Sequence, residues 1–298
     1  MSRMRGLLGP VRVPFLILTF ACVLLGLATA VWTTGHIHWL HLALGLIGAL
    51  SAHISVNVFN EYYDFKSGLD GKTLRTPFSG GSGTLPAMPE LAAPTQLLAW
   101  ASFGVTALIG LYFLAVRGIG LLPLGALGLL IILAYTNWIT RSPLLCLLAP
   151  GLGFGPLMVM GIHFILTGRY SWTAGIASLV PFFLVSNLLL LNQFPDVEAD
   201  RTVGRKHYPI AIGRQRSGLL FIGFLLLSYL AIGFGVCARQ LPWTSLFGLA
   251  TVVIGVPLVR GVLQYADNRE RLIPHMGQNV IVCIATPALV AVGLLVGR

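Results

Sequence analysis

Nine apolar stretches constrain the fold of this 298-residue chain more than any other feature of its sequence. Each is close to the ~20 residues that an α-helix needs to cross the hydrocarbon core of a membrane. They lie at 13–32, 39–58, 96–116, 119–137, 143–167, 173–194, 217–237, 242–260 and 279–297. Within a bilayer a helix satisfies its own backbone hydrogen bonds. The sequence therefore predicts an all-α, polytopic membrane protein with nine transmembrane helices, forming one domain over residues 1–298.

The composition supports this class and excludes others. The chain is 56% hydrophobic and 9% charged, whereas a soluble domain carries about 25% charged residues. The formal charge of +10 comes without a continuous basic face interleaved with aromatic residues, so we expect no nucleic-acid partner. The four cysteines lie in or beside apolar stretches without paired spacing, which argues against a zinc site, an iron–sulfur cluster or a disulfide framework.

The positions of lysine and arginine predict the orientation in the membrane. With the N-terminus in the cytoplasm, fifteen of the nineteen basic residues fall on the cytoplasmic side. Only Arg117, Arg169, Arg239 and Arg298 fall outside. Basic residues in short loops favour the cytoplasm. We therefore expect an integral protein of a prokaryotic inner membrane, in contact with membrane lipids, with its C-terminus outside.

Two acidic strings follow the second and sixth apolar stretches, at the predicted cytoplasmic face. They read NEYYDFKSGLD, from Asn60 to Asp70, and NQFPDVEAD, from Asn192 to Asp200, and they hold six of the nine acidic residues. Asn60 and Asp64 are four residues apart, and Asn192, Asp196 and Asp200 repeat this step. On a continuing helix, residues at this spacing share one face. Each string is thus predicted to present an amide and carboxylates along one helical stripe.

Facing stripes of carboxylates repel each other unless cations lie between them. Mg²⁺ takes oxygen ligands and commonly joins one or two carboxylates to the phosphates of a substrate. The alternatives are a solvated, charge-balanced loop and an ion-coupled transporter, because acids near membranes also serve transport. The clustering of the acids at one face, rather than at the midplane, favours a metal–diphosphate site over transport.

These two motifs resemble those of the UbiA family of intramembrane prenyltransferases, and the resemblance covers essentially the whole chain. It implies a nine-helix bundle around a central cavity, in which Mg²⁺ bound by the motifs holds a polyprenyl diphosphate. The metal site would comprise Asn60, Asp64, Asp70, Asn192, Asp196 and Asp200, with Asp64 and Asp196 essential for catalysis.

The first motif is most similar to the 1,4-dihydroxy-2-naphthoate polyprenyltransferase branch, which serves menaquinone and phylloquinone synthesis. Its last acid, Asp70, comes six residues after Asp64, and the loop TPFSGGSGTLP follows, from Thr76 to Pro86. The resemblance implies an aromatic, hydroquinone-type acceptor. Glu61 and Pro195 depart from the usual pattern of this branch. The alternative acceptors are 4-hydroxybenzoate, homogentisate and a lipid alcohol.

Further residues are candidates for catalysis and substrate binding. An allylic diphosphate ionises more readily when positive charge neutralises its leaving group. The basic candidates for this role are Arg205 and Lys206, which we expect to be catalytic, together with Arg141 and Arg12. Each of these could instead serve only topology. The other candidates are Tyr63 and Tyr135, which could stabilise a cation or belong to the interfacial aromatic belt, and Asn57, which could line the cavity.

The glycine-rich segment Gly80-Gly81-Ser82-Gly83 invites comparison with a nucleotide-binding loop. It lacks the Lys-Ser or Lys-Thr ending of such a loop, so ATP binding is not expected. We interpret it as a flexible cap over the active site, with a plain linker as the alternative. The run GLGFGP, Gly151 to Pro156, favours close helix packing or a kink.

Overall fold

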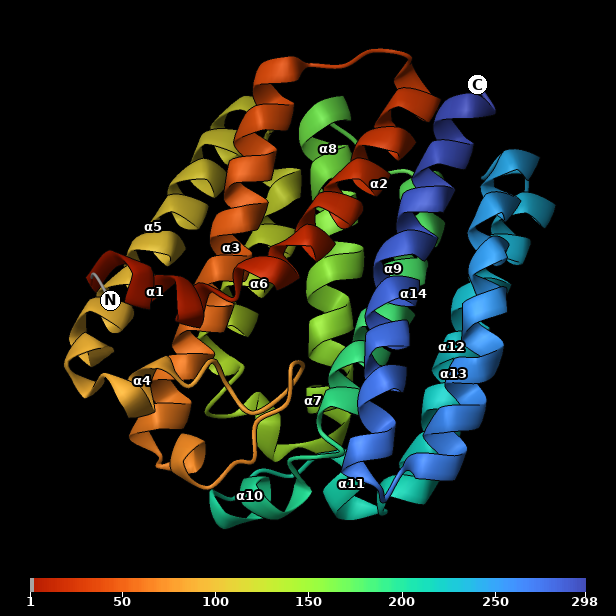
Figure 1. Cartoon of the computed structure of the whole chain (residues 1–298). Helices are drawn as coiled ribbons and strands as arrows, with labels where there is room; N and C mark the ends of the chain where they lie inside the picture. Colours follow the sequence, from red (N-terminus) through yellow and green to blue (C-terminus); the bar gives the residue numbers. More distant parts are fainter. Residues whose placement is uncertain (1–2) are drawn as a thin grey trace.

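The computed structural model describes residues 3–298, which form helices and turns without a β-strand in that range (Figure 1). The longer helices are α2 (Ile17–Thr34), α3 (Trp39–Lys66), α5 (Ala92–Arg117), α6 (Leu122–Ala134), α9 (Trp172–Asn192), α12 (Arg214–Cys237), α13 (Val252–Tyr265) and α14 (Arg269–Val296). The segment Pro143–Thr167 is one continuous rod made of α7 (Pro143–Leu152), the π-helix η6 (Gly153–Met160) and α8 (Gly161–Thr167). The prediction of an all-helical bundle is confirmed.

Short elements join these helices. They are α1 (Arg3–Val11), α4 (Thr84–Ala87), α10 (Val197–Thr202) and α11 (Tyr208–Ala211), with the 3-10 turns η1 (Val13–Leu16), η2 (Leu69–Gly71), η3 (Pro89–Leu91), η4 (Ile119–Leu121), η5 (Ile139–Arg141) and η7 (Trp243–Thr251). Of these, η2, α4 and η3 lie between α3 and α5, and α10 and α11 lie between α9 and α12.

Eight helical segments of the described chain are long and apolar enough to cross a membrane. The fourth stretch, expected at 119–137, forms the shorter apolar helix Ile119–Ala134, so nine spans of full membrane length are not confirmed within residues 3–298. A break at Gly118, with φ 90° and ψ 175°, separates it from α5, and turns follow at 135–138. The 13 residues of α6 reach about 20 Å, short of a hydrocarbon core about 30 Å thick.

Helix α9 lies at the centre of the bundle and is the most enclosed of the spanning segments. Its side chains Val180, Leu184 and Leu191 are fully buried against α2, α12 and α14. Helix α5, by contrast, packs mainly on α3, and few of its residues are fully buried. The bundle therefore has a dense half around α9 and a more open half around α3, α5 and α6.

The GLGFGP run packs closely against α9, as its glycines led us to expect. A Cβ atom at Gly151 would lie 2.2 Å from the carbonyl oxygen of Phe182, and one at Gly155 would lie 2.5 Å from that of Ser178. Only glycine permits this approach of two backbones. The same region forms the π-helix η6, and π-helical turns inside α-helices are frequent at functional sites.

Both acidic motifs lie at one end of the bundle, called here the motif end. Helix α3 continues past its expected boundary to Lys66 and so carries most of the first motif. The loop after α3, with α4, α10 and α11, gathers at the same end, opposite the C-terminus (Figure 1). This placement brings together two segments that are more than a hundred residues apart in the chain.

Candidate active site

The first motif occupies the last turns of α3 and the turn that follows. Asp64 is buried on α3, and Asn60, one turn earlier, is half-buried on the same side. Ser67 donates its backbone N–H to the carbonyl of Tyr63, and Gly68, with φ 74°, ends the helix in the left-handed conformation that glycine favours. The chain then turns back through η2, which buries Asp70.

The second motif is not one continuous helix, and the prediction of a single stripe is wrong here. Helix α9 ends at Asn192, a turn covers 193–196, and α10 begins at Val197. Pro195 lies in this turn, where it cannot donate a backbone hydrogen bond. Asp196 caps α10, and Asp200 lies inside it, so only these two residues keep the four-residue helical step.

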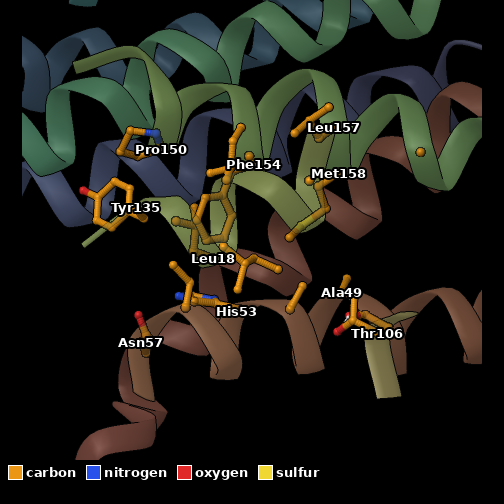
Figure 2. Close-up of a pocket in the computed structure, with 18 of the residues that line it drawn as sticks. Leu18, Ala49, His53, Asn57, Thr106, Tyr135, Pro150, Phe154, Leu157 and Met158 are labelled. Atoms are coloured by element: carbon orange, nitrogen blue, oxygen red, sulfur yellow. Dashed lines mark hydrogen bonds between the residues drawn. The ribbon is translucent and has the colours of Figure 1, made fainter. Parts of the chain in front are cut away.

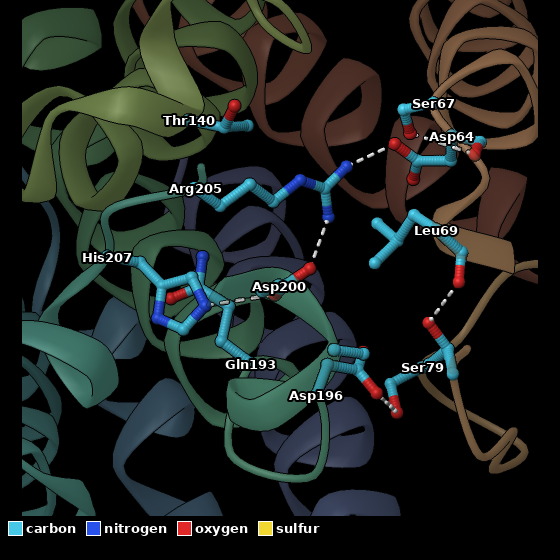
Figure 3. A network of polar contacts seen from close by, with 12 residues as sticks. Asp64, Ser67, Leu69, Ser79, Thr140, Gln193, Asp196, Asp200, Arg205 and His207 are labelled. Atoms are coloured by element: carbon cyan, nitrogen blue, oxygen red, sulfur yellow. Dashed lines mark hydrogen bonds and ion pairs between the residues drawn. The ribbon is translucent and has the colours of Figure 1, made fainter. Parts of the chain in front are cut away.

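Arg205 joins the two motifs (Figure 3). Its guanidinium donates to Asp64 Oδ1 on α3 and, at 3.0 Å, to Asp200 Oδ1 on α10. The arginine side chain is 17% exposed, and those of Asp64 and Asp200 are 9% and 4% exposed. Burial lowers the pKa of Arg205, but the two carboxylates outweigh it and raise this pKa above its ordinary value. A single cation therefore holds the two acidic segments together.

Two further side chains position the second motif, and sequence analysis did not find them. Nε2 of the buried His207 lies 2.9 Å from Asp200 Oδ2, and Ser79 donates to Asp196 Oδ1 at 3.3 Å (Figure 3). His207 gave no spacing signal, whereas Ser79 immediately precedes the segment 80–83 that was interpreted as a cap.

The glycine-rich loop packs over the first motif through Glu61. The backbone N–H of Ser82 lies 3.0 Å from each carboxylate oxygen of Glu61, and its hydroxyl donates to the same group. Arg12 contacts Glu61 from the other side at 3.3 Å. At Gly81, which has φ 74°, a Cβ would lie 2.8 Å from Asp70 Oδ1. The loop thus lies where the cap was expected, and Glu61 anchors it.

Two connected cavities meet at these motifs. The polar pocket, about 100 Å³, is lined by all six residues expected to bind metal, with Arg12, Arg205 and His207. The apolar cavity, about 500 Å³, extends into the open half of the bundle between α3, α5, α6 and η6 (Figure 2). Six residues line both and define the junction: Arg12, Asn60, Phe78, Tyr135, Leu189 and Asn192.

The polar pocket carries an excess of negative charge. Four aspartates and two arginines line it. Burial, with the nearby charges of Glu61 and Asp64, raises the pKa of Asp70 to about 7. Burial, with the charge of Asp200, raises the pKa of Asp196 to about 7. The pocket therefore favours a bound cation, because a cation relieves the repulsion that holds these protons in place.

The residues of the polar pocket fit a hard divalent cation. Asp70 Oδ2 and Asn192 Oδ1 are buried without a hydrogen-bond partner, and oxygen donors of this kind suit Mg²⁺. Within residues 3–298, no three His, Cys, Asp or Glu side chains form a ready-made metal cluster. Mg²⁺ usually keeps several waters and takes further ligands from substrate phosphates.

Other residues predicted for the site are placed differently. Asn57 lines the apolar cavity and donates to the Val11 carbonyl at 3.2 Å. The structure does not bring Tyr63, Arg141 or Lys206 into either cavity. Tyr63 precedes Asp64 by one residue and so lies on another face of α3, stacked on Phe59.

Arg141 and Lys206 are both exposed. The backbone N–H of Lys206 donates to the Thr140 carbonyl at 2.8 Å. Both therefore lie at the surface of the motif end and line neither cavity.

Comparison with known proteins places this architecture in a family. A model of the UbiA prenyltransferase family matches residues 18–274. The chain is 30% identical to a 1,4-dihydroxy-2-naphthoate octaprenyltransferase of Bacillus subtilis, over 93% of this chain and 88% of that protein.

Two solved structures share the fold. One is the apo structure of a UbiA homolog from Aeropyrum pernix K1, with a TM-score of 0.71, 17% identity, and 96% of this chain and 98% of that chain covered. The other is a UbiA homolog from Archaeoglobus fulgidus bound to GPP and Mg²⁺, with a TM-score of 0.60, 15% identity, and 96% and 99% of the two chains covered.

Proposed function

The chain belongs to the UbiA prenyltransferase family, and on this basis we propose that it transfers a polyprenyl group from an allylic diphosphate to 1,4-dihydroxy-2-naphthoate. The observation that carries the proposal is the junction of the two cavities. A pocket with four aspartates adjoins a long apolar cavity, and six residues line both. An allylic diphosphate has the matching form, because a charged head is joined to a hydrocarbon chain.

The diphosphate group would occupy the polar pocket. Asn60, Asp64, Asp70, Asn192, Asp196 and Asp200 would hold Mg²⁺ there together with the phosphate oxygens. When bound, Mg²⁺ would neutralise charge that develops on the departing diphosphate. Arg205 would add a second positive group, because its guanidinium lies between the motifs and can turn from a carboxylate to a phosphate.

The prenyl chain would lie in the apolar cavity, with its reactive carbon at the junction. The ring of Tyr135 and the ring of Phe78 line this point. Aromatic faces attract cations, and an apolar wall excludes water that would otherwise capture the allylic cation. Phe78 lies two residues before the glycine-rich segment, so the hydrogen bond from Ser82 in that segment to Glu61 would also help to hold this wall in place.

The reaction needs no covalent enzyme intermediate and no strong base. The carbon–oxygen bond of the donor breaks, and its electron pair leaves with the diphosphate. The carboxyl-bearing carbon of the hydroquinone ring then attacks the allylic carbon, and a carbon–carbon bond forms. Loss of CO₂ returns an electron pair to the ring and restores its aromaticity, so the protein has only to position and shield the reactants.

The naphthoate acceptor is supported by the spacing of Asp64 and Asp70, by the following glycine-rich loop, and by the name of the Bacillus subtilis relative. Membrane insertion follows from the eight spanning segments and the family. We place the motif end in the cytoplasm of a prokaryotic inner membrane, because most basic residues flank the spans on that side.

Purified protein in detergent or lipid would test the function. We would supply geranylgeranyl diphosphate and Mg²⁺ with 1,4-dihydroxy-2-naphthoate, 4-hydroxybenzoate or homogentisate, and measure diphosphate release and the prenylated product. The proposal expects a decarboxylated prenyl naphthoquinol and Mg²⁺-dependent diphosphate release. Transfer to 4-hydroxybenzoate alone would contradict the proposed naphthoate acceptor but would still support prenyl transfer as the reaction. Absence of transfer to every acceptor would overturn the reaction itself.

A further inference from the structure

The apolar cavity has a defined length. Three segments line it from the junction to its far end: Asn60 back to Gly45 on α3, Tyr135 back to Leu121 through α6, and Pro150 to Ile165 through η6 and α8. Each covers roughly fifteen residues, which at ~1.5 Å per residue corresponds to about 22 Å. Because three separate segments give the same length, we take about 22 Å as the depth of the cavity.

The far end of the cavity is closed. Its last lining residues, Phe113, Leu121 and Ile165, are 2%, 7% and 5% exposed, and they belong to one packed apolar cluster. Behind them, Arg117 donates to the carbonyl groups of Ile165 at 2.8 Å and Leu166 at 3.1 Å. A hydrocarbon chain that enters from the junction therefore meets a fixed floor.

We propose that this cavity encloses four isoprene units of the donor, and that Gly128 leaves the passage to the third and fourth units. This rests on the proposed function, since the donor head must lie in the polar pocket. An extended isoprene unit has four chain bonds and advances about 4.5–5 Å. The depth of the cavity therefore corresponds to about four units. Because the far end is closed, additional units of a longer donor leave the cavity through its open side.

Gly128 lies on α6, about halfway between the junction and the far end of the cavity. It is seven residues from Tyr135, which corresponds to about 10 Å, or two isoprene units, below the junction. A Cβ atom at Gly128 would have only one neighbour within 4 Å, Leu157 Cδ1 at 3.9 Å. Leu157 also lines the cavity, on the facing η6 (Figure 2). The missing side chain thus leaves space between two walls, which a larger residue would fill.

A series of donors tests the proposal. Wild-type protein is given Mg²⁺, the naphthoate acceptor and donors of two, three, four and eight isoprene units. We expect kcat/KM to rise up to four units and to gain nothing beyond. For Gly128→Phe we compare kcat/KM for the four-unit donor with kcat/KM for the two-unit donor. We expect this ratio to fall by at least about 100-fold, because a single surplus methylene in an apolar pocket already costs roughly 10–200-fold.

The matched control is Gly223→Phe. Gly223 lies within α12, lines neither cavity, and has no atom within 4 Å of an added Cβ, so the same substitution should leave the donor ratio unchanged. If Gly128→Phe loses both donors, Gly128→Leu is measured instead, and an equal loss for both donors there overturns the proposal. A wild-type preference that keeps rising past four units also overturns it.

A binding measurement separates this inference from the proposed function. Affinity for each donor is measured with Mg²⁺ and without acceptor, so it does not depend on turnover. A wild type that binds donors with the expected length dependence but transfers nothing contradicts the function and supports the cavity length. A wild type that transfers prenyl groups but shows no change of donor ratio in Gly128→Phe contradicts only the cavity length.

Discussion

Replacement of Arg205 by alanine tests the arrangement of the two motifs most directly. The guanidinium contacts Asp64 and Asp200, and all three side chains are less than a fifth exposed. Removing one partner of a buried ion pair leaves an uncompensated charge and costs about 3–5 kcal/mol. Here two carboxylates lose the same partner, and we expect a loss within that range.

The assay is thermal unfolding in detergent at pH 8, with and without Mg²⁺. The expected loss corresponds to a fall of about 5–15 °C in the apparent Tm. Mg²⁺ should recover more of the Tm in Arg205→Ala than it adds to the wild type, because the variant offers carboxylates that no protein cation occupies. Arg205→Lys should retain part of the stability, since it keeps a charge but not the two-armed geometry.

Arg141→Ala is the matched control, because Arg141 is an exposed arginine at the same end of the bundle. We expect it to change stability by less than about 0.5 kcal/mol. Prenyl transfer should fall by about 10²–10³ in Arg205→Ala, the loss seen when one group that stabilises developing negative charge is removed. An unchanged Tm in metal-free Arg205→Ala would refute the bridging role assigned to this residue.

Three further outcomes are expected. Asp64→Ala and Asp196→Ala should each abolish prenyl transfer while the helical circular dichroism remains, and near-normal turnover at saturating Mg²⁺ would contradict the two-motif site. The pKa of Asp70 and of Asp196 is raised to about 7, so both groups are ionised above that pH and protonated below it. The Mg²⁺ concentration for half-maximal activity should therefore rise at least about tenfold from pH 8 to pH 6. An Mg²⁺ requirement that does not change with pH would count against these groups as ligands. Lys72 and Thr202 are exposed, and Lys72 Nζ lies 3.4 Å from Thr202 Oγ1. A cysteine at either position should react with an impermeant thiol reagent only from the cytoplasmic side. Reaction from the outside would contradict the predicted topology.

The sequence was sufficient for the class of fold and for the pairing of the motifs. Apolar stretches of membrane length leave a chain few options besides helices, and that constraint acts locally. Four predicted spans, the third to the sixth, separate the two motifs, and this even number of crossings already predicted that Asp64 and Asp196 lie at one end. The fourth stretch was the exception: apolar content was adequate at 119–137, but the break at Gly118 and the turns after Ala134 shortened the helix.

Local rules also explain what failed at the second motif. The Asn192, Asp196 and Asp200 spacing is helical in form, and it suggested a continuous stripe. Pro195 interrupts that stripe, so Asn192 and Asp196 reach the polar pocket from two separate elements. A proline one residue before the acid was visible in the sequence, but its effect depends on whether the neighbouring turn packs against α3 and η2.

Only the tertiary structure distinguished between Arg205 and Lys206. Both are basic and adjacent in the chain, and any rule based on spacing treats them alike. In the folded protein Arg205 is buried between carboxylates from α3 and α10, whereas Lys206 is exposed. His207, two residues on, is buried against Asp200 although nothing in its sequence context marked it. The direction of a side chain in a loop depends on distant segments that pack around it, and such contacts carry no periodicity from which they could be read.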